Sequence, residues 1–350
     1  MASVVLALST TGARADKLVR VVGGGTQENN CPATDAKLMD PFGIDFDKAG
    51  NFYLVELKGE RVLKVDPKGH FTILAGTGAK GNSGDGGPAR QATFNGMHSL
   101  AVTPDGTIYV ADTLNHRVRK IDPKGIITAF AGTGKKASTG IGGPALQADL
   151  GGIYCLAFDA DFSKLYLTDL DNRRIHVVDM KTGILHHVAG NGKKGVPLDG
   201  ADAKASPLVD PRAACVDRKG NVYILERSGH ALRVVDADGK IRTVAGTGKP
   251  GNSGDDGDAL KATLNGPKHL CIDFDDNVLI ADSANHVIRR YTPKNGKIVR
   301  LAGTGKQGDS KDGGDPLHVS LNEPHGVYVH PNGTHYIVDS LNHRVFRWEK

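Results

Sequence analysis

Composition and charge already exclude several classes of partner for this chain of 350 residues. It is 39% apolar and only 5% aromatic, which suffices for a core built mainly from Val, Ile, Leu and Ala. The formal net charge is +5, but 39 acidic residues are interspersed with the basic ones. No basic stripe with interleaved aromatic residues is present, so we expect no nucleic-acid partner. No run after the N-terminal segment approaches the length of a membrane span, so we expect no such span.

Residues 1–15 resemble an export signal rather than part of a fold. Val4–Leu8 is a short apolar run, and Ala13-Arg14-Ala15 has the small-x-small pattern of a cleavage site. We therefore expect a secreted or periplasmic protein whose mature chain begins at Asp16. No basic residue precedes the apolar run, which leaves open a translation start further upstream.

A four-residue motif recurs at nearly constant spacing along the chain. Ala-Gly-Thr-Gly, once with Asn in place of Thr, begins at Ala75, Ala131, Ala189, Ala245 and Ala302, in steps of 56, 58, 56 and 57 residues. A diverged copy begins at Val22, 53 residues before Ala75. So regular a period indicates an array of equal structural units.

Residues 99–134 show what one unit contains. Four short runs rich in β-branched and apolar residues are separated by turns of Gly, Asn, Asp and Pro; they are Ser99–Val102, Thr107–Asp112, Arg117–Asp122 and Ile126–Ala131. This pattern predicts a four-stranded antiparallel meander.

Six such units predict an all-β, six-bladed β-propeller, with an open β-solenoid as the alternative. The last unit has three strands and ends at Arg344–Trp348, whereas the chain begins with an unpaired strand, Lys17–Val22. We expect this N-terminal strand to complete the sixth blade, because pairing would hide two sheet edges. Residues 16–350 would then form a single domain, which we expect to be a monomer.

The four cysteines do not form an evident disulfide framework. Three fall in first strands of their units and one lies in the first long loop; they are Cys155, Cys215, Cys271 and Cys31. We interpret them as small buried apolar side chains, although a disulfide cannot be assigned or excluded from sequence.

The turn between the second and third strands resembles the NHL-repeat family, whose members are β-propellers. The resemblance rests on Asn115-His116-Arg117-Val118, Asn285-His286-Val287 and Asn342-His343-Arg344-Val345. It implies a propeller fold and says little about function, because one fold hosts many functions. We interpret the three histidines as structural residues that bond backbone in the turn.

Aligning the six units locates a candidate ligand site. An acidic residue ends each second strand and sets the register: Glu56, Asp112, Asp169, Glu226, Asp282 and Asp339. The residues just before the first strands are then Phe42, His98, Tyr154, Arg212, Lys268 and His325. We expect this ring to face the mouth of the central channel. Its mixed chemistry favours contact with a ligand, and ordinary rim residues are the alternative.

Units one and four differ from the others in the turn after the second strand, where Lys58 and Arg227 lie. Tolerated variation of surface turns would explain this difference. Alternatively, Lys58 and Arg227 extend over the mouth and form an electropositive funnel with Arg212 and Lys268. Such a funnel would suit a carboxylate, phosphate or sulfate group.

The segments around two mouth histidines resemble those of the peptidyl-hydroxyglycine amidating lyases, which are NHL propellers. These segments are Met97–Val102 and Pro324–Val327. The resemblance implies a zinc ion on three such histidines and a functional arginine, which Arg227 matches. Only His98 and His325 are present here, because Arg212 occupies the third position. The family's tyrosine is also absent, with Asp171 near its place.

The sequence thus supports two main functions at the same mouth. The first is a module that binds a small anionic ligand or a protein or peptide partner. The second is a metal-assisted lyase or hydrolase, in which His98 and His325 hold zinc or another divalent ion and Tyr154 acts as acid or base. Arg212 would then orient the substrate together with Lys268 and Arg227. A protein-docking platform is a third possibility.

Overall fold

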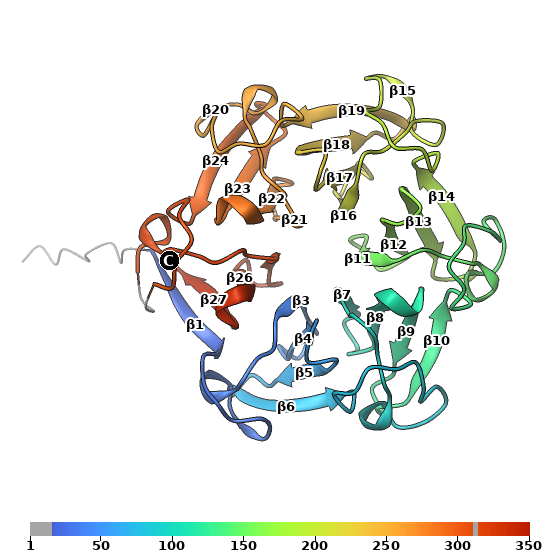
Figure 1. Ribbon diagram of the computed structural model, residues 1–350, viewed down its shortest axis with the longest axis vertical. Coiled ribbons are helices and arrows are strands. Elements are labelled where there is room, and N and C mark those ends of the chain that lie inside the picture. The colour runs from blue at the N-terminus through green and yellow to red at the C-terminus, as the bar shows by residue number, and fades with distance from the viewer. Residues whose placement is uncertain (1–15, 311–313) are drawn as a thin grey trace, which may run out of the picture.

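Six antiparallel sheets surround a common axis in the computed structural model, which describes residues 16–310 and 314–350 (Figure 1). The first strand of each repeat lies nearest the axis, and the fourth lies at the rim. The expected export signal, residues 1–15, lies outside the described residues. No helix in the described part is long and apolar enough to cross a membrane.

The first three blades follow the chain without interruption. Blade one contains β3 (Pro41–Phe46), β4 (Phe52–Glu56), β5 (Val62–Val65) and β6 (His70–Ala75), with β2 (Cys31–Pro32) along its outer edge. Blade two contains β7 (Ser99–Val102), β8 (Ile108–Asp112), β9 (Arg117–Ile121) and β10 (Ile127–Ala131). Blade three contains β11 (Ile153–Phe158), β12 (Lys164–Asp169), β13 (Arg174–Asp179) and β14 (Leu185–Ala189).

The last three blades repeat this order, and the final one borrows the N-terminal strand. Blade four contains β16 (Pro211–Val216), β17 (Val222–Glu226), β18 (Ala231–Val235) and β19 (Lys240–Ala245), with β15 (Ala201–Asp202) outside. Blade five contains β21 (His269–Ile272), β22 (Val278–Asp282), β23 (Val287–Thr292) and β24 (Lys297–Ala302), with β20 (Gly257–Asp258) outside. Blade six contains β25 (Gly326–Val329), β26 (His335–Asp339), β27 (Arg344–Glu349) and β1 (Lys17–Gly23).

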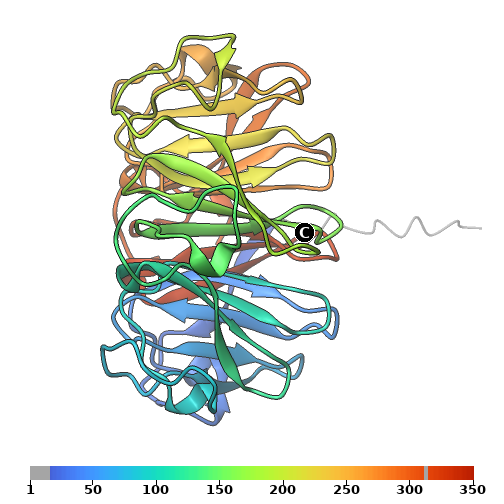
Figure 2. The ribbon, with the colours of Figure 1, turned by 90° about the vertical axis from the view of Figure 1, so that its right-hand side faces the viewer.

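Short 3-10 turns occupy the connections. Five lie in the long connections between blades: η1 (Ala33–Asp35), η2 (Ala89–Gln91), η4 (Ala145–Gln147), η5 (Ala259–Lys261) and η7 (Pro316–His318). Three lie between second and third strands: η3 (Thr113–Asn115), η6 (Ser283–Asn285) and η8 (Ser340–Asn342). Both kinds of connection gather on one face of the disc, whereas the chain ends on the opposite face (Figure 2).

The ring closes as the sequence predicted. β1 pairs antiparallel with β27, from Lys17 opposite Glu349 to Gly23 opposite Arg344. Leu18 and Val22 of β1 are fully buried, so the closing strand contributes core as well as backbone hydrogen bonds. The six-bladed propeller is therefore confirmed, and the open solenoid is excluded.

The core lies between blades rather than within them. The buried apolar residues form six clusters, and each cluster joins neighbouring blades; five join two blades, and the sixth joins blades four and five with Cys155 of blade three. Val55 of blade one, for example, belongs to the same cluster as Val110 of blade two. No blade can bury both faces of its sheet alone, which is why the units must be arranged in a ring.

The acid that ends each second strand ties the incoming connection to the blade. In blade two, the fully buried Asp112 accepts hydrogen bonds from the Asn95 backbone (2.9 Å) and from the Asn115 amide (2.9 Å). Arg117 adds an ion pair at 3.2 Å. These residues fix the loop that leads into the first strand, so the repeated acid has a structural role.

Two of the three NHL histidines link their blade to the next one, whereas Nδ1 of His116 has no hydrogen-bond partner among the described residues. His116, His286 and His343 adopt the left-handed conformation, with φ of 55°, 56° and 52°. The Nδ1 atom of His286 accepts from the Glu323 backbone at 3.0 Å, and that of His343 accepts from the Asp40 backbone at 3.2 Å. The backbone partners of His286 and His343 therefore lie at the start of the following blade. We had expected these partners within each histidine's own turn.

All four cysteines are free thiols, and three of them are fully buried, with Cys271 partly buried. Cys155 and Cys215, with exposed fractions of 2% and 6%, belong to one apolar cluster. Their interpretation as small buried side chains is confirmed.

Blades one and four replace the Asp–Asn pair by a Glu–Gly pair, and the two changes are physically linked. A Cβ atom on Gly59 would lie 2.0 Å from the Glu56 carboxylate, and one on Gly229 would lie 2.7 Å from Glu226. The longer acid therefore occupies the space that the asparagine takes in the other blades. This linkage explains why these two turns depart from the repeat.

Gly59→Asn is expected to destabilise the fold by about 1–3 kcal/mol through overpacking. Adding Glu56→Asp to this variant should restore much of the lost stability, since the double variant recreates the Asp–Asn pair of blade two. We expect a coupling energy between the two substitutions of about 0.5–3 kcal/mol. Urea unfolding of the single and double variants measures this coupling. Gly87→Asn is the control, because its Cβ would meet only an ordinary contact at 3.5 Å. Strictly additive effects would contradict the linkage.

Candidate ligand site at the channel mouth

Six side chains from the six blades lie together at one end of the channel. The Phe42 ring lies 4.1 Å from the His325 ring and 5.2 Å from the His98 ring. His98 in turn lies 4.4 Å from Tyr154, over which the Arg212 guanidinium stacks at 4.7 Å. Lys268 and His325 form a further contact within this set of side chains, in which Lys268 Nζ donates to His325 Nε2 at 2.6 Å.

Irregular strand pairing directs three of these side chains into the mouth. The register between first and second strands shifts between Pro41 and Ile44, between Ile153 and Cys155, and between Pro211 and Ala213. The residues at the shifts include Phe42, Tyr154 and Arg212. Bulges of this kind re-aim side chains and concentrate near functional sites. No feature of the sequence analysis predicted these register shifts.

Arg212 differs from every other buried arginine in the described part of the chain. Five buried arginines pair with carboxylates at 2.7–2.9 Å: Arg61, Arg119, Arg233, Arg289 and Arg344. Arg212 is only 5% exposed, yet its one hydrogen bond goes to the Tyr154 carbonyl at 3.3 Å. Burial and the nearby Arg227 lower the pKa of Arg212 to about 10. It is a buried cation without a carboxylate partner.

Lys268 and His325 share a carboxylate that the sequence analysis missed. Lys268 Nζ donates to Glu323 Oε2 at 2.7 Å, and His325 Nε2 lies 3.6 Å from the same oxygen. Contact with His325 and Lys268 lowers the pKa of Glu323 to about 2, whereas burial lowers the pKa of His325 to about 4. At neutral pH Glu323 is therefore a carboxylate and His325 a neutral imidazole, and Lys268 donates to both.

Lys58 and Arg227 are also paired with acids. Lys58 Nζ lies 2.8 Å from Asp40 and Arg227 Nε lies 2.8 Å from Asp210, and both basic side chains remain substantially exposed. These ion pairs leave Arg212 as the main uncompensated charge of the expected funnel. Asp40, Asp210 and Glu323 all lie two residues before a ring residue, and this shared position is the signal that could have revealed them.

The two mouth histidines do not fit a divalent metal ion. The Phe42 ring contacts both imidazoles, and His325 Nε2 is engaged by the Lys268 ammonium. His98 Nδ1 bonds the Gly96 carbonyl at 2.8 Å, and burial with the charge of Arg212 lowers its pKa. Within the described residues no three His, Cys, Asp or Glu side chains are grouped to hold a metal. Asp171 instead pairs with Lys136 at 2.7 Å.

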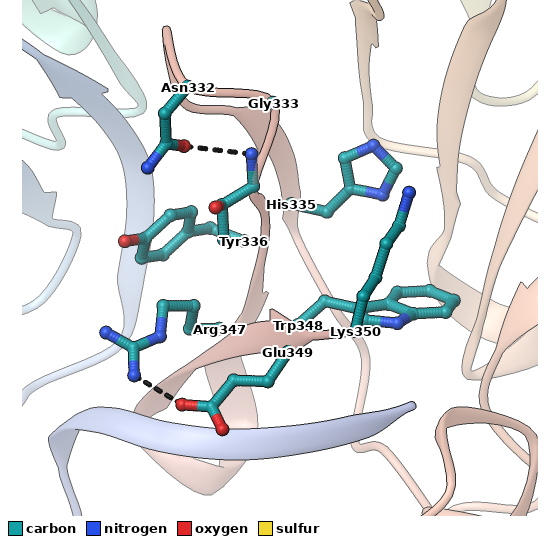
Figure 3. A pocket seen from close by; sticks show the side chains of 9 residues that line it. Asn332, Gly333, His335, Tyr336, Arg347, Trp348, Glu349 and Lys350 are labelled. Atoms are coloured by element: carbon teal, nitrogen blue, oxygen red, sulfur yellow. Dashed lines mark hydrogen bonds and ion pairs between the residues drawn. The ribbon is translucent and has the colours of Figure 1, made fainter. Parts of the chain in front are cut away.

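A cavity of about 640 Å³ lies away from the mouth, at the edge of blade six. It is lined by the 332–334 turn and the end of β27, with Tyr336 and Arg347 on one side of the strands and His335 and Trp348 on the other (Figure 3). The sequence analysis did not point to this cavity.

The chain forms a closed propeller of antiparallel sheets, and its repeats carry the Asn-His turn between the second and third strands. The chain belongs to the NHL-repeat family of six-bladed β-propellers. A family model described as the Teneurin NHL domain matches residues 77–122 and 145–250.

Among curated proteins, Protein SUPPRESSOR OF QUENCHING 1, chloroplastic, from Arabidopsis thaliana is 30% identical over 279 residues, or 76% of this chain and 26% of that protein. NHL repeat-containing protein 2 from Gallus gallus is 27% identical over 340 residues, or 88% of this chain and 46% of that protein. This chain therefore spans about a quarter to a half of the length of these relatives.

Solved structures share the fold at low sequence identity. An auxiliary nutrient binding protein from Bacteroides ovatus has a TM-score of 0.69 at 18% identity, covering 96% of this chain and 76% of that one. Virginiamycin B lyase from Staphylococcus aureus has a TM-score of 0.52 at 14% identity, covering 96% and 99%. At such identities the likeness concerns the fold alone.

Proposed function

We propose that this chain is an exported binding module that takes a small anionic ligand at the channel mouth. The observation that supports it is Arg212, a buried guanidinium with no carboxylate partner among the described residues. Burying an unpaired charge is costly, so such a group is best explained by a partner that arrives from solution. A carboxylate, phosphate or sulfate group matches the planar donor fork of arginine.

The neighbours of Arg212 favour an organic anion with a flat or apolar body. Phe42, His98 and Tyr154 form a continuous aromatic wall beside the guanidinium. Lys268 supplies a second cation, whose charge Glu323 partly offsets. A peptide carboxylate would meet the same requirements. The metal-assisted reaction is less well supported, because the Lys268 ammonium engages His325 Nε2 and the Phe42 ring packs against the same imidazole.

Titration calorimetry with benzoate and with inorganic phosphate at low ionic strength tests the proposal. We expect Arg212→Met to weaken binding at least tenfold, since a charge-assisted pair is lost. Arg242→Met is the control, because Arg242 is exposed and pairs with Asp236 at 3.3 Å on an outer strand. Equal binding by wild type and Arg212→Met would remove the mouth as the anion site.

The pH dependence follows from the same groups. Burial lowers the pKa of Lys268, and that of Arg212 is about 10. Both groups lose charge as the pH rises, so anion affinity should fall in the alkaline range. A rise in affinity across that range would contradict the assignment.

A further inference from the structure

A second cavity, of about 500 Å³, occupies the channel beyond the mouth ring. None of the six ring residues lines it. Its walls come from the middle of the first strands and from the turns that follow them, so it opens on the face opposite the mouth. The residues three positions after the ring residues form one tier of this wall: Asp45, Ala101, Ala157, Cys215, Cys271 and Tyr328.

Asp45 is the acidic counterpart of Arg212. Its carboxylate accepts hydrogen bonds from the Val102 backbone at 2.7 Å and the Phe46 backbone at 2.8 Å. It makes no ion pair within the described residues, and burial raises its pKa to about 7. When ionised, this carboxylate faces a largely apolar cavity without a counter-charge.

Two further polar side chains, His269 and Tyr328, line the cavity wall. His269 is only 8% exposed, and its Nδ1 atom has no hydrogen-bond partner in the described part of the chain. The Tyr328 ring lies 4.4 Å from that of His269, and the Ile44 backbone hydrogen-bonds the Tyr328 side chain. Burial lowers the pKa of His269 to about 3, so it is a neutral imidazole that can accept a hydrogen bond.

The remaining charges around the cavity are predominantly acidic. Asp159, Asp273 and Asp276 line it together with a single base, Arg218. Arg218 is already paired with Asp276 at 3.1 Å. The cavity thus has the opposite charge to the mouth at the other end of the channel, and an organic anion is disfavoured there.

Exposed aromatic rings stand at the opening. Phe162 and Phe274 line the cavity with exposed fractions of 36% and 57%. Phe162 has a φ of 60°, a left-handed conformation that is unusual for a bulky residue, whereas Gly50, Gly106 and Gly220 adopt it in equivalent turns. The Phe162 ring packs against Phe158 at 5.3 Å. Aromatic faces at the rim suit a cation with an apolar body.

We propose that this cavity is a second ligand site, which binds a compact organic ammonium ion from the face opposite the mouth. The ammonium would pair with Asp45, while the apolar body would lie against the aromatic rim. None of its lining residues belongs to the mouth ring, so either site can be occupied without the other.

Titration of the full chain with phenethylammonium chloride at pH 8, where Asp45 is ionised, tests the proposal. We expect this cation to bind at least tenfold more tightly than 2-phenylethanol or 3-phenylpropionate, which share its ring. Asp45→Asn should remove that advantage, whereas Asp105→Asn, an exposed aspartate on the same face, should not. Arg212→Met should still bind the ammonium more tightly than the alcohol, which separates this site from the mouth.

Phe162→Gly provides a variant that should fold normally, because glycine occupies this turn position in other blades. We expect weaker phenethylammonium binding with a melting temperature close to that of wild type. Equal affinity for the alcohol and the ammonium, or full binding by Asp45→Asn, would overturn the proposal.

Discussion

Replacing Arg212 by methionine is expected to stabilise the protein, by about 1–3 kcal/mol, whereas the same change at Arg233 should destabilise it by about 3–5 kcal/mol. Both guanidiniums are buried, with exposed fractions of 5% and 3%. Arg233 donates to the fully buried Glu226 at 2.7 Å and 2.9 Å, so its removal leaves an unpaired carboxylate in the core. Arg212 leaves no such group behind.

The sign of the Arg212 effect follows from its pKa. A cation whose pKa falls on folding destabilises the fold at every pH below the folded value, here about 10. Methionine removes that penalty and keeps a long apolar side chain, at the cost of the contact with the Tyr154 ring, about 0.5–2 kcal/mol. Urea unfolding at pH 7 compares the two variants. If Arg212→Met destabilised the protein as strongly as Arg233→Met, an internal partner would explain the guanidinium and the ligand proposal would lose its main support.

Removing residues 1–24 is expected to lower the free energy of unfolding by about 5 kcal/mol and the melting temperature by roughly 10 °C. The truncation deletes β1, which buries Leu18 and Val22 completely. Each contributes about 1.5–3 kcal/mol through burial, and the edge of β27 loses its partner. A shift of about 2 °C per kcal/mol is typical of larger domains.

The single tryptophan reports on this closure. Trp348 lies in β27, opposite Leu18, and its Nε1 atom donates to Asp16 at 3.1 Å. Its fluorescence should therefore change in the truncated protein before global unfolding. A chain lacking only residues 1–15 is the control and should melt like the full chain. An unchanged melting temperature without β1 would mean that the ring does not depend on the closing strand.

Much of this architecture could be predicted from the sequence, because it depends on local periodicity. The repeat spacing gave the number of blades, and the alternation within each unit gave the strands. The unpaired run Lys17–Val22 and the three-stranded last unit together required closure through β1 and β27. Alignment on the second-strand acids also placed Phe42, His98, Tyr154, Arg212, Lys268 and His325 at one level of the channel, where the structure brings them into contact.

What the tertiary structure decided is which charges are compensated. Lys58, Arg227 and Lys268 find partners in Asp40, Asp210 and Glu323, whereas Arg212 and Asp45 find none in the described part of the chain. Periodicity assigns a residue to a level and a face of the sheet. An ion pair depends instead on a few ångströms between side chains of different turns or blades, on local bulges and on burial. The distances and burial that decide ion pairing are set only when the six repeats are arranged around one axis. They make the mouth cationic and the cavity beyond it acidic.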